Sequence, residues 1–203
     1  VGTNNTNYVS KWNGTALVSS GVYDDGTNVG IGTTTPAYKL DVSADAQING
    51  VRVGRGGGNQ ASNVMIGSYA LMTNSSGFAN TAVGYYSLFS NTTGSTNTAI
   101  GQHTLYANTI GKWNTALGCQ ALYNNIDGTS NTALGLQSLH ANTTGDNNTA
   151  VGRDALLRNS TGNNNVALGQ EAGFNGVSGS GNVFLGYQAG YNETGSNTLY
   201  IAN

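Results

Sequence analysis

Residues 80–130 read NTAVGYYSLFSNTTGST, NTAIGQHTLYANTIGKW and NTALGCQALYNNIDGTS, three segments of equal length that follow one another directly. Each segment begins with Asn, passes through a short apolar step to Gly, and ends in a polar stretch. Similar starts recur at a constant interval of seventeen, at Asn63, Asn80, Asn97, Asn114, Asn131, Asn148, Asn165 and Asn182, with a partial ninth start at Asn197. Such a period is typical of solenoids, in which each repeat forms one coil. We therefore predict an all-β domain of β-solenoid or β-roll-like, seventeen-residue repeats over residues 61–203.

The positions within the repeat, counted from its Asn, indicate what each coil, or rung, contains. Positions five and fifteen are Gly at almost every rung, which indicates backbone conformations or close approaches that other residues tolerate poorly. The NTAVG segment is short and bounded by Gly, and we expect a strand there. The YYSLFS segment is equally compatible with a second strand or a single helical turn. The NTTGS segment has the composition of a turn.

One rung supplies two large apolar side chains, an aliphatic residue at position four and, in six rungs, Leu at position nine. This is too little to offset about 1–2 kcal/mol of backbone entropy per residue. We expect stacking of the rungs to add ladders of Asn at positions one and twelve. Small residues at positions three and eight would let three chains approach one another closely. The pattern therefore favours an elongated homotrimeric fibre.

Residues 1–60 follow a different pattern. Short alternating runs at Ala16–Val18, Val29–Ile31, Tyr38–Val42 and Ile48–Val53 are separated by turn signals at Asp25-Gly26 and Asn49-Gly50. We predict a short-stranded β region over residues 1–60, ending in a Gly-rich hinge at Gly54–Gln60. This glycine run lacks the Lys-Ser/Thr and the strand-to-helix context of a phosphate-binding loop.

Composition excludes several classes of protein. Only 8% of the 203 residues are charged and the net charge is −2, so we expect no nucleic-acid partner. No apolar run reaches the roughly 18 residues of a membrane span, so we expect no membrane insertion. Cys119 is alone, which leaves no disulfide framework. The chain starts at Val1 and stops at Asn203 within its pattern, and we expect it to be part of a longer protein.

The repeat resembles the head repeats of trimeric autotransporter adhesins, whose shorter coils carry an Asn-Ser-Val-Ala-Ile-Gly core. The segment NVGIGTTTPAYKLDVSADAQINGVRVGRG at Asn28–Gly56 and the C-terminal NVFLGYQAGYNETGSNTLYIAN resemble phage-type tail-fibre-domain proteins. The resemblance covers nearly the whole chain, although the rung is longer than in the adhesin heads. It implies a trimeric extracellular fibre used for attachment or spacing. Fibres of this kind often end in a cleaved chaperone domain, of which this sequence carries no motif.

Nothing in the sequence converges on a catalytic, cofactor or metal site. His103 and His140 fall in different columns of the repeat, and neither has a recurrent carboxylate beside it. Asp24-Asp25 precedes Gly26 as a turn signature, and the oxygen ligands of a calcium site are not spaced around it. We expect no enzyme activity, no cofactor and no metal.

The variable positions six, seven and ten are better candidates for function. Position ten is rich in aromatic residues, which we expect to pack between neighbouring chains and cover the thin core. Positions six and seven are expected to face solvent, with receptor contact as the sharper alternative. The candidate contact residues are Tyr69, Tyr85, Tyr86, Gln102, His103 and Tyr187.

The sequence therefore predicts a structural segment of a phage tail fibre or phage-like contractile particle, acting in attachment to a host cell. Its expected partners are two further copies of itself, baseplate or fibre-shaft proteins, and a host surface glycan or protein receptor. The expected location is extracellular, on a virion, a phage-like particle or a bacterial surface. A bacterial cell-surface trimeric adhesin is the alternative. An ice-binding solenoid is less favoured, because Val64, Val166 and Val183 interrupt the Thr column at position two.

Overall fold

A computed structural model describes residues 7–202, with only the backbone of Trp12 and Ser19 described, and it divides into two compact units. One unit ends at Ala46 and the other begins at Gln47. Val1 and Asn203, on which the expectation of a longer protein rests, lie outside the described residues. Both units are built from strands and turns, and a 3-10 turn at Gly57–Asn59 is the one helical element among the described residues.

The N-terminal unit contains a four-stranded sheet in the order β1-β2-β3-β4. Pairing is antiparallel from β1 to β3 and parallel between β3 and β4. At the predicted Asp25-Gly26 turn, the Asp25 carboxylate accepts hydrogen bonds from the backbone N–H groups of Thr27 (2.8 Å) and Asn28 (2.7 Å). These bonds to the ionised form lower the pKa of Asp25, with the bond from Asn28 the largest cause. The strands are β1 (Tyr8–Trp12), β2 (Leu17–Asp24), β3 (Val29–Ile31) and β4 (Leu40–Val42).

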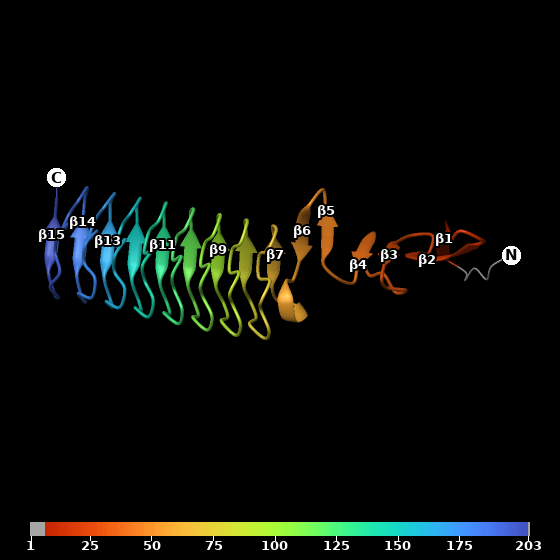
Figure 1. Ribbon diagram of the computed structural model, residues 1–203, viewed down its shortest axis with the longest axis horizontal. Coiled ribbons are helices and arrows are strands. Elements are labelled where there is room, and N and C mark those ends of the chain that lie inside the picture. Colours follow the sequence, from red (N-terminus) through yellow and green to blue (C-terminus); the bar gives the residue numbers. More distant parts are fainter. Residues whose placement is uncertain (1–6, 203) are drawn as a thin grey trace. The chain divides into compact units, whose positions relative to one another are not determined.

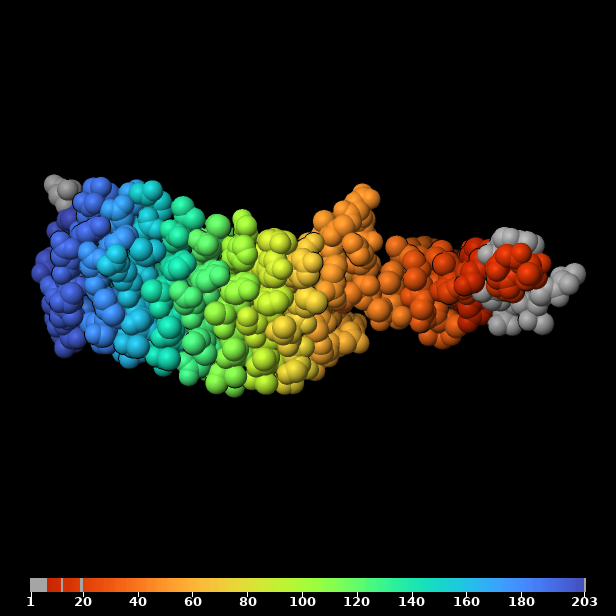
Figure 2. Space-filling view, viewed as in Figure 1, coloured from red at the N-terminus to blue at the C-terminus, as the bar shows by residue number. Residues whose placement is uncertain are grey.

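The second unit is a β-solenoid, as predicted, with one three-residue strand per rung (Figure 1). Its strands occupy positions two to four of the repeat and pair in parallel without a change of register from β7 to β15. The space-filling view shows the rungs as adjoining bands of one continuous surface (Figure 2). The strands are β7 (Val64–Ile66), β8 (Thr81–Val83), β9 (Thr98–Ile100), β10 (Thr115–Leu117), β11 (Thr132–Leu134), β12 (Thr149–Val151), β13 (Val166–Leu168), β14 (Val183–Leu185) and β15 (Leu199–Ile201).

The ninth rung starts one residue later than the sequence pattern suggests. Leu199 pairs with Val183, and the N–H of Thr198 donates to Oδ1 of Asn182 at 2.9 Å, so Thr198 takes the first position. Asn197 has φ 59° and fills the last position of the eighth rung, where Ala79 (φ 54°) and Thr96 (φ 61°) stand in earlier rungs. The interval from Asn182 to Thr198 is 16 residues, one fewer than in the other rungs. The deletion falls in the preceding turn and therefore leaves the strand in register.

The segment after each strand is neither a strand nor a helical turn. Residues at positions seven and nine adopt left-handed φ, as at Tyr86 (57°) and Leu88 (49°), and the intervening backbone forms consecutive turns. This conformation costs an L-residue about 1–2 kcal/mol. Hydrogen bonds to both neighbouring rungs offset that cost, since the N–H of Tyr86 donates to Ser68 (3.1 Å) and that of Leu88 to Thr104 (3.0 Å).

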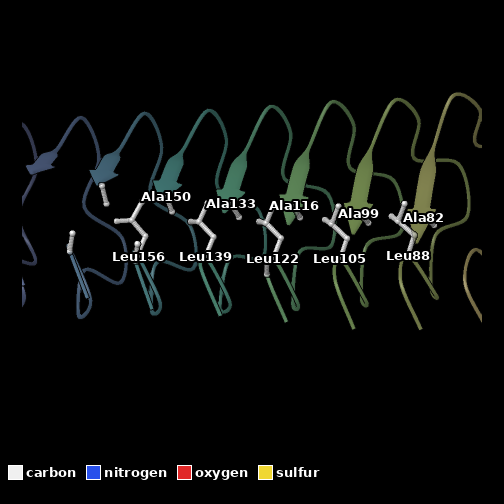
Figure 3. Close-up of a cluster of buried hydrophobic side chains, with 14 of the residues drawn as sticks. Ala82, Leu88, Ala99, Leu105, Ala116, Leu122, Ala133, Leu139, Ala150 and Leu156 are labelled. Atoms are coloured by element: carbon white, nitrogen blue, oxygen red, sulfur yellow. The ribbon is translucent and has the colours of Figure 1, made fainter. Parts of the chain in front are cut away.

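The core differs from the sequence prediction at one position. Position nine is buried as expected, but its partner is the small residue at position three rather than the aliphatic residue at position four (Figure 3). Ala116 and Leu122 are fully buried, whereas Leu117 is 49% exposed. Successive residues of a strand point to opposite faces, so position four faces outward once position three faces inward. The small residues at positions three and eight thus fill the core, and the prediction that they lie between chains is wrong.

A compensating exchange of volume near the C-terminal end supports this assignment. Phe184 occupies position three, where Ala stands in the six preceding rungs, and is 1% exposed. Position nine is Gly at the two places that flank it, Gly173 and Gly190. A Cβ added at Gly173 would lie 2.6 Å from Cδ2 of Phe184, and one at Gly190 would also overlap the ring. One aromatic ring therefore fills the space that two leucines fill elsewhere.

Buried Asn ladders run along positions one and twelve, as the sequence predicts. Nδ2 of Asn108 donates to Oδ1 of Asn91 in the preceding rung at 2.8 Å. At position one, the backbone N–H of Asn97 donates to Oδ1 of Asn80 at 3.0 Å. Asn80 and Asn91 also share one acceptor, the carbonyl of Gly94, at 2.9 and 3.0 Å.

Glycine at position fifteen is required by these ladders rather than by a left-handed backbone. A Cβ on Gly94 would overlap Oδ1 of Asn91 and lie 2.5 Å from the carbonyl oxygen of Gly111. Real Cβ atoms do not approach other atoms this closely. The glycine therefore lets two amide side chains reach one carbonyl within the stacked rungs.

The predicted Gly-rich hinge instead covers the first rung. The N–H of Gly57 donates to the carbonyl of Leu71 at 2.8 Å, and its own carbonyl accepts from Nδ2 of Asn74 at 3.0 Å. A Cβ at Gly57 would lie 2.5 Å from the carbonyl oxygen of Asn74, so the glycine permits this close packing. Two further strands, β5 (Ala46–Ile48) and β6 (Val51–Gly54), extend the solenoid sheet beyond β7, with β6 antiparallel to it. The second unit thus starts earlier than residue 61.

We expect Leu122→Ala to lower the free energy of unfolding by about 2–5 kcal/mol, because it leaves a cavity in a core with one large side chain per rung. The matched control is Ile126→Ala in the same rung, where the side chain is 46% exposed and the expected loss is below about 1 kcal/mol. Chemical denaturation followed by circular dichroism measures both. Equal losses in the two variants would contradict the assigned core.

Candidate functional site

The candidate contact residues lie on the turn segment that follows each strand, at positions six and seven. Tyr69, Tyr85, Gln102 and Tyr187 are exposed, while Tyr86 and His103 are half-buried. Five of the six lie in the first three rungs, and the sixth, Tyr187, lies in the eighth. The structure therefore brings five of the six together on one surface and leaves Tyr187 apart from them.

At position seven, rings stack directly on one another from rung to rung. The ring centroids of Tyr69 and Tyr86 are 4.7 Å apart with 12° between the ring planes, and those of Tyr86 and His103 are 5.5 Å apart with 11°. The spacing between neighbouring strands of about 4.7–4.9 Å is close to the separation of stacked rings. Identical placement in consecutive rungs is therefore sufficient to produce the stack.

A second stack forms at position ten. Its ring centroids lie 5.4 Å apart for Phe89–Tyr106, 5.1 Å for Tyr106–Tyr123 and 5.2 Å for Tyr123–His140, with 9°, 7° and 3° between the ring planes. These residues were expected to pack against neighbouring chains, but within this chain they pack against one another. The two stacks touch edge to face where Tyr86 meets Phe89, at 4.9 Å. We call the combined surface the aromatic ladder; its members are Tyr69, Tyr86, Phe89, His103, Tyr106, Tyr123 and His140.

Stacking determines what the aromatic ladder can bind. The faces of the inner rings are covered by their own neighbours, so these rings present edges and polar atoms outward. A sugar ring packs against an aromatic face, and this mode requires a face that is free. Tyr85 lies outside both stacks, meets Tyr69, Tyr86 and His103 edge to face, and is 46% exposed. The best candidates for contact with a sugar are therefore the exposed position-six residues Tyr85 and Tyr187.

Polar side chains replace the rings at position seven in the later rungs. Nε2 of Gln137 donates to Oε1 of Gln120 at 2.9 Å. Further along, Glu171 accepts from Nε2 of Gln188 at 2.7 Å and forms an ion pair with Arg153 at 3.1 Å. Hydrogen bonds from Gln188 and then Gln170 lower the pKa of Glu171. This carboxylate is held in its ionised form by structural neighbours.

The described residues provide no candidate metal centre. Within residues 7–202, no three His, Cys, Asp or Glu side chains lie together in a way that could hold a metal ion. Cys119 is exposed at position six. In the same range, no helix is long and apolar enough to cross a membrane. Comparison with known proteins gives no match, whether to family models, curated sequences or solved structures.

The aromatic ladder predicts a pH-dependent stability. Burial lowers the pKa of His140 below its ordinary value of 6.5, and the nearby Asp154 opposes the shift. Below about pH 6.5 the unfolded chain therefore binds a proton that the folded chain binds more weakly, and the free energy of unfolding falls as the pH falls. His140→Tyr keeps a stacked ring without this titration. When the pH is lowered from about 7.5 to about 5.5, on either side of the ordinary pKa of histidine, we expect the denaturation midpoint to fall further for the wild type than for the variant. Parallel profiles would contradict the assignment.

Proposed function

We propose that this chain is a structural, non-enzymatic segment of a homotrimeric fibre in a phage tail or phage-like contractile particle, contributing to attachment to a host cell. The observation that carries the proposal is the strictly registered stack of rungs, held by backbone and Asn hydrogen bonds on every side. A stack of eight rungs extends about 40 Å. Such a stack gives the chain length and stiffness, the properties that a fibre segment requires.

The outward side of the strands is the surface best suited to association between copies. Positions two and four face outward. In the eight rungs from Val64 to Leu185, these two positions hold only Val, Thr, Ile and Leu, so none of their side chains is ionisable. Ile66, Leu117 and Leu168 are each about 40–50% exposed. We call this surface the strand face. Identical copies can bring such faces together without repulsion between like charges.

The area of the strand face is consistent with a stable contact. Eight strands at about 4.8 Å give a length near 40 Å, and the three strand residues with one flanking residue on each side give a width near 17 Å. The product is about 680 Å², and side-chain relief increases it. A standard interface buries about 800 Å² per partner. Association therefore needs most of the rungs in register, which favours side-by-side alignment of whole solenoids.

Alternative functions share the same scaffold. A bacterial cell-surface trimeric adhesin would use the strand face for assembly and position six for receptor contact in the same way. An ice-binding solenoid would use the strand face itself, because Thr81, Thr98, Thr115, Thr132 and Thr149 form its outward position-two column. That column is half-buried for the most part and is Val at both ends, so the ice-binding alternative is less favoured.

We expect analytical ultracentrifugation to give a particle of three times the chain mass of 20.8 kDa. Leu117→Glu combined with Leu134→Glu places two charges on the strand face and should give a folded monomer. The control is Thr144→Glu combined with Thr161→Glu, which places the same charges in neighbouring rungs at an exposed corner and should leave the trimer intact. A monomeric wild type would contradict trimerisation, whereas a trimeric Leu variant would contradict only the strand face.

Attachment is tested on an array of bacterial lipopolysaccharides and capsular polysaccharides. We expect binding that falls about threefold to tenfold in Tyr85→Ala or Tyr187→Ala, the loss expected for one aromatic contact. Tyr38→Ala in the N-terminal unit, where the side chain is 76% exposed, is the control and should bind normally. Equal binding by all three variants would remove position six as the contact, and an absence of binding to every glycan would favour a protein receptor.

A further inference from the structure

The Asn ladder at position twelve has a direction. From Asn91 onward, Nδ2 of each member donates to Oδ1 of the Asn in the preceding rung, for example from Asn91 to Asn74 at 2.8 Å and from Asn142 to Asn125 at 2.7 Å. The same Nδ2 also donates to the position-fifteen carbonyl of its own rung, as Asn142 does to Gly145 at 3.0 Å. All amides therefore point the same way. The members are Asn74, Asn91, Asn108, Asn125, Asn142 and Asn159.

A ladder with a direction has two unlike ends. At the N-terminal end the donor is satisfied, because Nδ2 of Asn74 donates to the carbonyl of Gly57 at 3.0 Å. At the C-terminal end Asn159 is 1% exposed, and its Oδ1 has no hydrogen-bond partner. Leaving a buried acceptor unpaired is costly, so native structures rarely do so.

The cause is a change of residue in the next rung. Position twelve there is Gly176, which is buried and has no amide to donate. The carbonyl of Gly179 loses a donor for the same reason. It accepts from Nδ2 of Asn165 at 2.8 Å, whereas the equivalent carbonyl of Gly162 accepts from both Asn148 (2.8 Å) and Asn159 (3.0 Å). Two acceptors thus face the place where an Asn amide stands in the six rungs before.

The other buried ladder shows that the chain can end such a series with a donor. At position one, Oδ1 of Asn182 accepts from the N–H of Thr198 at 2.9 Å and from its hydroxyl at 2.8 Å. Among the described residues, one other buried side-chain atom lacks a partner, Oδ1 of Asp154. The Asp154 side chain is 15% exposed and lies at the surface, so its case differs from that of Asn159.

We propose that one water molecule is bound beside Gly176, where it takes the place of the position-twelve amide and donates its two hydrogens to Oδ1 of Asn159 and to the carbonyl of Gly179. A neutral molecule with two donors reproduces what Nδ2 supplies in every earlier rung. Buried waters typically have two to four polar partners, which this site supplies. The aligned amides polarise one another, and this strengthens the bond accepted by the last of them.

The geometry at Gly176 also permits a direct replacement of the water. Its φ lies outside the left-handed region, and an added Cβ would meet the carbonyl oxygens of Glu193 at 3.1 Å and Gly173 at 3.6 Å. Accommodating the 3.1 Å contact requires the Glu193 carbonyl to shift by a few tenths of an ångström. An Asn side chain at this position can therefore extend the ladder by one rung and displace the water.

A high-resolution crystal structure of the full chain tests the proposal. We expect a solvent peak within hydrogen-bonding distance of both Asn159 Oδ1 and the Gly179 carbonyl oxygen. In Gly176→Asn the new amide should occupy that place and raise Tm by about 2–4 °C. Gly176→Ala, which adds a Cβ without a donor, should retain the peak and show no such gain.

A wild-type map without solvent at that place, or one with the Asn159 amide turned to another partner, would overturn the proposal. A Gly176→Asn variant that keeps the solvent peak with its new side chain elsewhere would also count against it. Should this variant fail to fold, the wild-type map alone decides. The test is independent of trimer formation, since the site lies inside one solenoid.

Discussion

The constraint on which the structure depends is that each side chain in the solenoid has its own counterpart as a neighbour, in the rung above and the rung below. Only side chains that pack well against copies of themselves suit a buried column. The Asn amide does so because it carries a donor and an acceptor, Ala and Leu do so by shape, and flat rings do so by stacking. Like charges in adjacent rungs repel one another. This explains why only 8% of the residues are charged and why Asn is the main polar residue of the buried columns.

Much of the repeat domain could be predicted from its sequence, because the constraint produces columns of identical residues. The period, the strand at positions two to four and the two Asn ladders were all predictable from columns of identical residues. Which face of the strand points inward could not be predicted, because a three-residue strand has one residue on one side and two on the other. Size was a misleading guide, since the narrow interior favours Ala116 over Leu117. The useful signal was a paired change, in which Phe184 replaces Ala at position three and Gly173 and Gly190 replace Leu at position nine.

The turn segment and the aromatic ladder were harder to predict for a related reason. Left-handed leucines are rare, so no propensity points to φ 49° at Leu88. Hydrogen bonds to the two neighbouring rungs offset the free-energy cost of that conformation. The aromatic columns were visible in the sequence, but whether their rings present faces or edges depends on that backbone. The Gly-rich segment before the first rung was ambiguous, because glycine serves flexible linkers and close packing equally well, and its contacts with Leu71 and Asn74 decide between them.

The deletion in the eighth rung shows how such a molecule can change during evolution. The turn of this rung is one residue shorter than in the other rungs, and β14 and β15 still pair in register. A deletion within positions two to four would instead shift outward residues into the core. Among the second to sixth rungs, which share Ala at position three and Leu at position nine, gain or loss of a complete rung joins two surfaces that already match and preserves these buried columns. The solenoid can therefore lengthen or shorten by recombination in steps of one rung, about 4.8 Å each, while single-residue changes in length are confined to its turns.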